Sequence, residues 1–365
     1  MQLGIIGLAR SGKTTVFNAV TRGAAQVGAY SSNTQPNVGV VNVPDDRVDR
    51  LAAIYHPKKS TYATIQYVDF PAAGESFGKG EGPAGKFINE LARMEALIHV
   101  VRAFEDETVP HPDVTIDPDR DIVTMDLELA FADLAIIEKR LQRMETELRS
   151  LKPGERDQLQ HTKDLLLRMK AALEQEIPIR EQNLTHEDWR LLEGSAFLTS
   201  MPLLLVVNIG ERDLPRRAEI EAGFRERYRR PGRDVAAFCG KFEMELNELG
   251  EEEAVEFRAA AGVSESGMAE AIRLSYALLG LVSFLTAGPD ECRAWTVAAG
   301  STAPEAAGKI HSDLKRGFIR AEVVRFDDLV ACGSEAEARK HGLLRTEGKQ
   351  YVVHDGDILN ILFNV

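Results

Sequence analysis

The chain has 365 residues, 44% of them hydrophobic and 28% charged, which excludes a fibrous or disordered protein and predicts two or three globular domains. No apolar run approaches the roughly 18 residues of a membrane span, and no basic leader precedes the first apolar run, so we expect a cytoplasmic protein without membrane contacts. Three widely spaced cysteines argue against disulfides or a zinc site, and a net charge of -13 excludes a protein that coats nucleic acid with its whole surface.

The first elements predict an α/β domain. Gln2–Ile6 is predicted to form a short buried strand, followed by a glycine-rich turn and a helix that begins at Lys13. Further strands are predicted at Val38–Val43, Ala63–Asp69, Ala96–Val101 and Leu203–Val207. Strands that alternate with helices predict a mainly parallel sheet covered on both faces.

A long helical segment interrupts this alternation. Its apolar residues recur at three- and four-residue steps: Leu134, Ile137, Leu141, Met144, Leu148 and Leu151 before Lys152-Pro153-Gly154, then Leu159, Leu166, Met169 and Leu173. Two such seams around a Pro-Gly turn predict an antiparallel, coiled-coil-like hairpin over residues 127–198. Two amphipathic helices packed onto the sheet would give a similar pattern.

The last part of the chain predicts a small α+β module, of the β-grasp type. Its expected elements are strands at Trp295–Val297, Ala321–Val324, Lys349–Val353 and Asp357–Leu362, and a helix near Pro304–Leu314. We therefore expect an α/β domain at 1–126 and 199–280, a helical arm at 127–198, and a separate domain at 281–365.

The turn after the first strand carries the strongest motif. Gly7–Thr14 matches G-x-x-x-x-G-K-[ST], the phosphate-binding P-loop, and it lies between a predicted strand and a predicted helix. Lys13 would bridge the β- and γ-phosphates, and the Thr14 hydroxyl would bind Mg²⁺. The expected nucleotide-binding residues of this segment are Arg10, Ser11, Gly12, Lys13, Thr14 and Thr15. A glycine turn with an unrelated lysine is the alternative interpretation.

Two other predicted strands end in polar residues. Asp69 ends the strand 63–69, at the sheet edge where ligands bind, and is expected to reach the magnesium ion. Asn208-Ile209-Gly210-Glu211 follows the buried strand 203–207, where guanine-specific switch proteins carry Asn-Lys-x-Asp. Glu211 is one methylene too long for the aspartate's pairing with guanine, while Asn208 could still bond a purine edge. These residues weaken guanine selection and permit ATP.

Several stretches together resemble the YchF family, the Obg-like ATPases, over nearly the whole chain. They are Pro36–Val41, Lys79–Gly82, His99–Asp106, Lys309–Leu314 and the ending from Asp355 to Val365. The resemblance implies a nucleotide-binding domain interrupted by a helical arm, and a C-terminal TGS domain. It also implies hydrolysis of ATP with a relaxed or switched nucleotide preference, so that ATP is preferred or accepted alongside GTP, and association with the ribosome or ribosomal RNA.

The resemblance also suggests further site residues. Relatives lack the water-positioning glutamine of Ras-like enzymes, and the loop histidine that stands in for it matches His111 here. Thr34 is the candidate for the second magnesium-binding hydroxyl, and Cys239-Gly240-Lys241 matches the base-facing loop. An ordinary loop histidine is an equally good reading of His111. Ala72 and Ala73 depart from the family's Asp-x-x-Gly pattern, which puts coupling to the γ-phosphate in doubt.

The sequence is consistent with three functions. The leading hypothesis is an ATP-hydrolysing switch that acts on a ribosomal partner. The alternatives are a nucleotide-binding module without hydrolysis and a small-molecule kinase, which the arm and the extra module do not suit. Eight arginines within Arg212–Arg233 could form an RNA-facing patch or a solvated helix face.

Overall fold

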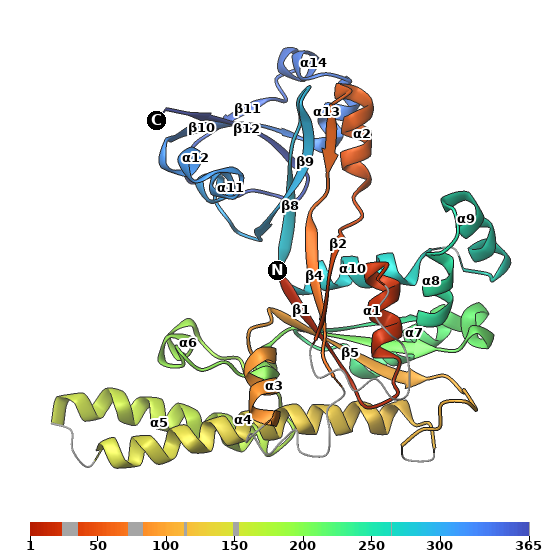
Figure 1. The fold of residues 1–365 in the computed structure, drawn as a ribbon. Coiled ribbons are helices and arrows are strands. Elements are labelled where there is room, and N and C mark those ends of the chain that lie inside the picture. The colour runs from red at the N-terminus through yellow and green to blue at the C-terminus, as the bar shows by residue number, and fades with distance from the viewer. Residues whose placement is uncertain (24–35, 72–82, 113–114, 149–152, 264, 365) are drawn as a thin grey trace. The chain divides into compact units, whose positions relative to one another are not determined.

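The computed structural model describes residues 1–23, 36–71, 83–112, 115–148, 153–263 and 265–364 (Figure 1). These residues form two compact units. The first unit consists of Met1–Gly39 and Gln66–Ala271, and the second of Val40–Ile65 and Ile272–Val365. Residues 40–65 therefore group with the C-terminal part of the chain, whereas the expected domain boundaries placed them with the P-loop. The three-part division stays a prediction.

The sheet of the first unit is mainly parallel, as predicted. Its strand order is β2-β4-β1-β5-β6-β7, and β1–β4, β1–β5, β5–β6 and β6–β7 are parallel pairs. The strands are β1 (Gln2–Ile6), β2 (Asn37–Asn42), β4 (Thr64–Asp69), β5 (Ala96–Ala103), β6 (Leu203–Ile209) and β7 (Arg233–Phe238). Five of them match the predicted runs, and β7 was not foreseen. Buried side chains line both faces of β5 and β6, which explains their nearly continuous apolar sequences.

Helices accompany the sheet of the first unit. They are α1 (Lys13–Thr21), α3 (Pro83–Leu91), α7 (Arg217–Tyr228), α8 (Gly240–Leu246) and α9 (Glu251–Ala260), with the 3-10 turn η4 (Glu211–Arg216); α10 (Gly267–Leu278) begins in this unit and continues into the second. The core cluster beneath the sheet joins Leu203, Leu205 and Val207 of β6 to Leu91 of α3 and Phe224 of α7. The α/β class predicted from the sequence is thus confirmed.

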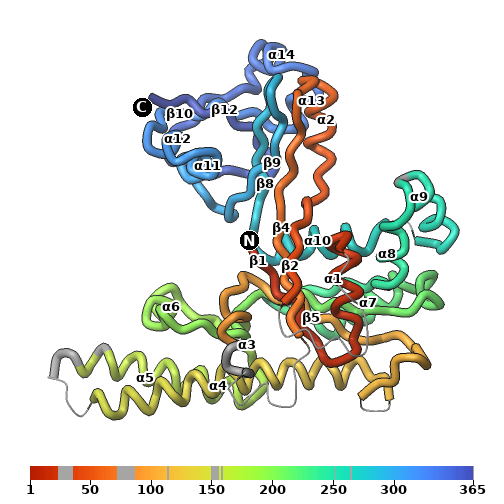
Figure 2. The backbone as a smooth tube through the Cα atoms, viewed as in Figure 1, coloured from red at the N-terminus to blue at the C-terminus, as the bar shows by residue number. Residues whose placement is uncertain are grey.

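The predicted helical hairpin is present in α4 (Pro118–Leu148) and α5 (Pro153–Leu173), which lie side by side in Figures 1 and 2. The predicted seam residues Ile137, Leu141, Met144, Leu166, Met169 and Leu173 form its apolar core. The helix α4 runs without a break through residue 127, because its first turns bury Ile122 and Met125 against the sheet. The predicted seam therefore belongs to the hairpin, and only the first turns of α4, which precede the predicted pattern, pack onto the sheet.

Short elements close the arm: η2 (Ile179–Glu181), α6 (His186–Leu191) and η3 (Leu198–Ser200). The fully buried Asp133 of α4 accepts hydrogen bonds of 2.8 Å from the backbone amides of Leu198 and Thr199. A third bond of 2.6 Å comes from the Thr199 hydroxyl. This one carboxylate therefore joins the outgoing and the returning chain at the root of the arm.

The second unit contains its own sheet, ordered β11-β10-β12-β8-β9-β3. Its strands are β3 (Lys59–Thr61), β8 (Leu281–Thr286), β9 (Glu291–Ala298), β10 (Phe318–Arg325), β11 (Arg345–Glu347) and β12 (Asp357–Phe363). Its helices are α2 (Asp46–Tyr55), α11 (Ala303–Ile310), α12 (Ser312–Arg316), α13 (Phe326–Cys332) and α14 (Glu335–Lys340). Alanines 303, 306 and 307 let α11 pack closely on Phe284, Val323 and Leu359 of the sheet.

One predicted strand of this unit is wrong. Lys349–Val353 forms only an isolated bridge between Val352 and Thr302, and the strand next to β10 is instead Arg345–Glu347. The segment is drawn toward the start of α11, where Tyr351 O accepts from Ala303 N at 2.8 Å. The Tyr351 hydroxyl also donates to Asp357 at 2.7 Å. The pattern of residues in Lys349–Val353 that predicted a strand is therefore explained by these contacts.

Candidate functional site

The P-loop is built from two glycines at positions without room for a side chain. A Cβ on Gly7 would lie 2.4 Å from the backbone oxygen of Val100, and one on Gly12 would lie 2.3 Å from Asn208 Nδ2. Gly12 also has a φ of 87°, in the left-handed region that favours glycine. It caps α1, so the amides of the first helical turn stay free to bind an anion.

Lys13 is folded back onto the loop that it would use to hold phosphate. Its Nζ donates to the backbone oxygens of Gly7 and Leu8, both at 3.1 Å, and the residue is only 7% exposed. Burial lowers the pKa of this ammonium to about 8, although the charge of Asp69 acts in the opposite direction. A phosphate would replace the two neutral acceptors with charged ones.

Thr14 and Asp69 are brought together as expected. The Thr14 hydroxyl donates to Asp69 Oδ2 at 2.9 Å, and Asn37 Nδ2 donates to the same oxygen at 3.4 Å. Burial raises the pKa of the Asp69 carboxyl, and the Thr14 hydrogen bond opposes this shift. The other oxygen, Oδ1, is buried and has no hydrogen-bond partner among the described residues. A hydroxyl beside an incompletely paired carboxylate is a donor set that suits Mg²⁺.

Asn208 connects two loops of the site. Its Nδ2 donates to the backbone oxygen of Ser11 at 3.1 Å, and its Oδ1 accepts from the Gly240 amide at 3.0 Å. The side chain therefore fixes the P-loop against the start of α8, and one Nδ2 hydrogen is left for a purine. The Ser11 hydroxyl is buried without a partner among the described residues.

Glu211 and Lys241 face each other across this end of the site. Lys241 Nζ lies 2.7 Å from Glu211 Oε1, and this bond raises the pKa of the lysine. Both side chains are about half exposed or more. The preceding Cys239 is buried at the start of α8, where burial raises the pKa of its thiol. It is thus placed as a packing residue.

His111 contacts Asp121 of α4, which is not one of the expected nucleotide-binding residues. Its Nε2 is 3.0 Å from Asp121 Oδ2 in α4, and the side chain is 3% exposed. Arg10, which has a φ of 62°, links the P-loop to the same loop, since its Nη1 donates to Pro110 O at 2.8 Å. The histidine would have to leave Asp121 before it could meet solvent.

Two remaining candidates have no shown role. Thr15 is half-buried in the first turn of α1. Thr34, like Ala72 and Ala73, lies outside the described residues.

Phe104 lies beside the P-loop, a position that the sequence analysis did not assign to it. It follows β5 directly, and its ring or Cβ lies 3.6 Å from where a Cβ of Gly12 or Gly210 would be. The guanidinium of Arg102 stacks on this ring at 4.5 Å from the centroid. Its position at the carboxyl end of a parallel strand was the available signal, because ligands bind at that edge.

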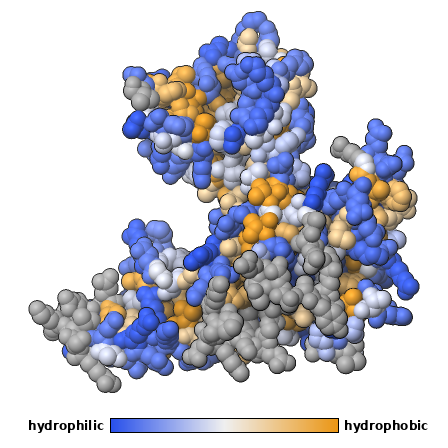
Figure 3. Space-filling view, in the orientation of Figure 1, coloured by the Kyte–Doolittle hydropathy of each residue, from blue (hydrophilic) through white to orange (hydrophobic). Residues whose placement is uncertain are grey.

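The arginines of residues 212–233 are largely neutralised by acidic neighbours. Arg227 pairs with Asp119 at 2.7 Å, Arg233 pairs with Asp126 at 2.8 Å, and Arg225 contacts both Glu221 and Asp234. Figure 3 shows a surface on which hydrophilic residues predominate in this view. The structure favours the interpretation of a solvated, ion-paired helix over that of an RNA-facing patch.

A parallel sheet with a P-loop between β1 and α1, a Thr–Asp pair, and an Asn-bearing strand end defines a P-loop nucleoside triphosphate hydrolase. Two protein-family models match the chain. One, described as "50S ribosome-binding GTPase", matches residues 2–115, and the other, YchF-GTPase_C, described as a protein of unknown function, matches residues 281–364.

Similar proteins cover the chain almost completely. The "Ribosome-binding ATPase YchF" of Bacillus subtilis is 41% identical and that of Escherichia coli O157:H7 is 36% identical, each over 99% of both chains. The structure named as the Schizosaccharomyces pombe YchF GTPase matches with a TM-score of 0.83 and 29% identity, covering 99% of this chain and 97% of that one. The chain belongs to the YchF family. Among the described residues, no helix is long and apolar enough to cross a membrane.

Proposed function

We propose that this chain is a Mg²⁺-dependent nucleotide hydrolase of the cytoplasm that prefers ATP, accepts GTP, and acts as a nucleotide-dependent switch on the ribosome. The observation that carries the proposal is the Thr14–Asp69 hydrogen bond of 2.9 Å directly beside the buried amine of Lys13. Lys13 supplies a cation for the phosphates, and Thr14 and Asp69 supply two oxygens for a metal ion. Lys13 and Thr14 lie in the first turn of α1, and Asp69 lies at the end of β4.

The metal would neutralise phosphate charge when bound. The chain's own residues would hold the nucleotide: Lys13 by its ammonium, and the start of α1 by free backbone amides. Thr14 and Asp69 would bind the ion, with its remaining ligands supplied by phosphate and water.

The ATP preference rests on the base-facing end of the site. Glu211 Oε1 accepts from Lys241 at 2.7 Å, so the charge of this carboxylate is partly neutralised and the group is a weaker acceptor for guanine than an unpaired one. Adenine lacks the N1–H and 2-amino donors that require such an acceptor. Asn208 keeps one Nδ2 hydrogen for a purine ring nitrogen, which both bases offer. The site therefore supports binding of either nucleotide without strict guanine selection.

The ribosomal partner rests on the relatives. The Bacillus subtilis and Escherichia coli proteins are both named ribosome-binding ATPases, and they align with this chain from end to end. The helical arm supplies a projecting surface that the nucleotide site does not use.

The test measures dissociation constants for ATP and GTP with Mg²⁺, and phosphate release from each with and without ribosomes. A Lys13→Ala variant provides the background. We expect tighter binding of ATP, turnover that depends on Lys13, and faster turnover with ribosomes. A strong preference for GTP would contradict the base assignment, and turnover unchanged in Lys13→Ala would contradict the site.

A second candidate is a nucleotide-binding switch without its own hydrolysis. It is favoured by the position of His111, whose imidazole is buried against Asp121 and away from solvent. Tight nucleotide binding with no phosphate release above background, even with ribosomes, would support this alternative. Rapid release that is lost in His111→Ala would instead support a positioning role for the histidine.

A further inference from the structure

The strand β12 of the second unit is paired unequally on its two sides. It pairs with β10 from Phe363 back to Asp357, but with β8 at the single position Ile358–Leu285. The neighbouring strand β8 ends at Thr286, one residue after the paired Leu285. Residues Leu359–Phe363 therefore have no strand partner on the β8 side among the described residues. Alternate residues of such a strand direct their amide and carbonyl groups toward that open side.

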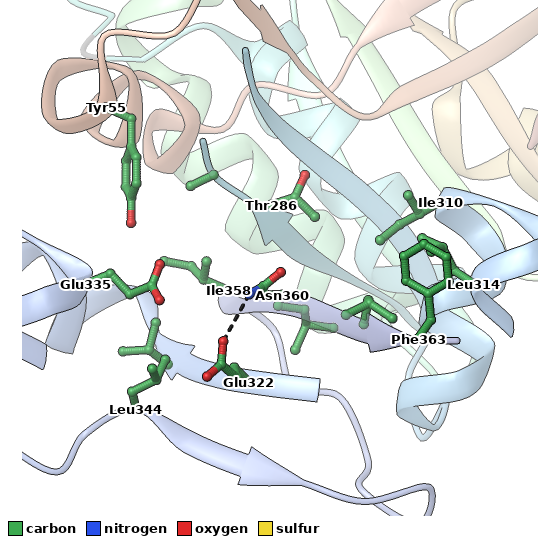
Figure 4. A pocket seen from close by; sticks show the side chains of 14 residues that line it. Tyr55, Thr286, Ile310, Leu314, Glu322, Glu335, Leu344, Ile358, Asn360 and Phe363 are labelled. Carbon is green, nitrogen blue, oxygen red and sulfur yellow. Dashed lines mark hydrogen bonds between the residues drawn. The ribbon is translucent and has the colours of Figure 1, made fainter. Parts of the chain in front are cut away.

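A cavity of about 350 Å³ lies beside this open side of β12. It is lined by Thr286 at the end of β8, by the following Ala287, and by Asn360, Ile361 and Phe363 of β12. Figure 4 shows Ile310, Leu314 and Phe363 gathered at one end, and Glu322 and Glu335 toward the other. The space is of the size of a ligand-binding cleft and begins where the two strands part.

The two ends of the cavity differ in chemistry. Ile310, Leu314 and Phe363 make one end apolar. Phe363 is 48% exposed, and the neighbouring Leu362 is 40% exposed. Exposed apolar side chains beside unpaired strand backbone are a combination that binds extended peptides.

The other end is acidic. Glu322 and Glu335 line it, and no lysine, arginine or histidine of the described part of the chain does. Arg339 contacts both carboxylates, at 2.9 and 3.4 Å, so one cation serves two anions. Asn360 Nδ2 donates to Glu322 at 3.0 Å and orients it. This wall repels phosphate groups and attracts a further cationic side chain.

We propose that the cavity is a docking site for an extended segment of a partner protein, which adds to the open side of β12 as a strand. The segment carries a lysine or arginine that faces Glu335, and an apolar side chain that enters between Leu314 and Phe363. Strand backbone supplies the hydrogen bonds, and the two side chains supply selectivity. The site contains no residue of the nucleotide-binding machinery, so it is independent of the proposed hydrolysis.

The probe is a short synthetic peptide of alternating valine and threonine with one central lysine, added to the ¹⁵N-labelled full-length chain. Two matched peptides serve as controls, one with glutamate in place of the lysine and one with alternate backbone nitrogens methylated. We expect the lysine peptide to shift the amide signals of Leu359–Phe363 and to slow hydrogen exchange at the alternate amides of this segment that face the open side. Both control peptides should bind at least roughly fivefold more weakly, because each removes one of the two recognition elements.

Matched variants separate local charge from total charge. Glu335→Lys should weaken the lysine peptide and strengthen the glutamate peptide, whereas Asp290→Lys makes the same charge change outside the cavity lining and should do neither. Glu335→Gln, which adds no new charge, checks that the fold is retained. The proposal is overturned if none of the peptides shifts these amides. It is equally overturned if oligouridine RNA shifts them more strongly, or if they shift with protein concentration alone because a second copy binds.

Discussion

Asn208 and Ser11 lie almost two hundred positions apart, and the hydrogen bond of 3.1 Å between Asn208 Nδ2 and Ser11 O holds the P-loop to the end of β6. Gly12 lies directly against the same amide nitrogen. The shape of the phosphate loop therefore depends on a residue that the family pattern associates with the base. A displacement of Asn208, in the part of the site expected to face the base, would therefore also move the P-loop.

The first prediction follows from this contact. Gly12→Ala places a Cβ 2.3 Å from Asn208 Nδ2 and keeps a φ of 87°, so the asparagine must move. The conformational strain alone costs roughly 1–2 kcal/mol. We expect a larger loss of stability than that, and loss of nucleotide binding. Gly262→Ala is the matched control, because its φ is 73° with nothing within 4 Å. Equal destabilisation of the two variants in urea would disprove the role of the close contact.

The pKa of Lys13 predicts how binding depends on pH. Burial lowers this pKa to about 8 in the nucleotide-free protein, and bound phosphate should restore it toward 10.5. Binding then takes up a proton above pH 8, so affinity should fall by up to roughly tenfold per pH unit there. Titration calorimetry in two buffers of different ionisation enthalpy measures the proton uptake. Lys13→Ala should bind weakly at every pH, and an affinity in the native chain that is constant across this window would refute the assignment.

The Glu211–Lys241 pair predicts a change of base preference. Glu211→Asp shortens the side chain, which weakens the bond of 2.7 Å to Lys241 and frees a carboxylate that reaches guanine donors. We expect the ratio of ATP to GTP affinity to fall by roughly tenfold, the equivalent of one charged hydrogen bond. Fluorescent nucleotide titrations measure both affinities. Glu245→Asp, whose side chain also lies near Lys241, is the control and should leave the ratio unchanged.

The root of the arm predicts a stability effect that is separate from nucleotide binding. Asp133→Ala leaves the buried amides of Leu198 and Thr199 without an acceptor. We expect a loss of roughly 2–4 kcal/mol in the free energy of unfolding, with nucleotide affinity nearly unchanged. Asp157→Ala, an exposed change on α5, should have little effect. Unfolding in urea measures both, and a neutral Asp133→Ala would mean that the arm does not depend on this anchor.

The same aspartate predicts a pH dependence. Burial raises the pKa of Asp133 to about 6 in the folded protein, above its ordinary value of 3.8. The folded state then binds more protons than the unfolded state between these values, so this residue's contribution to stability falls as pH rises from about 4 to about 6. Comparing urea unfolding of the native chain and Asp133→Asn across that range isolates the contribution. If the free energies of unfolding of the two proteins differ by the same amount at every pH, Asp133 does not cause the pH dependence.

The sequence was informative where one local pattern decides the structure. The P-loop motif correctly predicted the turn between β1 and α1, and apolar, β-branched runs located β1, β2, β4, β5 and β6 because buried parallel strands leave little choice of residue. The strand β7 (Arg233–Phe238) was missed, since it begins with Arg233 and Asp234, whose charges are paired by Asp126 and Arg225. Such partners come from other parts of the chain and leave no local signal.

The contacts of the site residues were less predictable than their positions. Pairing of Thr14 with Asp69 follows from strand ends meeting at one edge of the sheet. The ring of Phe104 beside Gly12, the ion pair of Glu211, and the burial of His111 against Asp121 all depend on loops. Loop geometry is set by the packed fold as a whole, and no spacing rule encodes it.

The anchor at Asp133 has a consequence for how the arm can change over time. Because Asp133 of the outgoing helix α4 binds the returning chain at Leu198 and Thr199, the arm leaves and re-enters the first unit at one place. Whole turns of α4 and α5 could be deleted or duplicated in register without altering the distance that the sheet must bridge. The length of the arm can therefore change to suit a partner, and the sheet that carries the P-loop need not change with it.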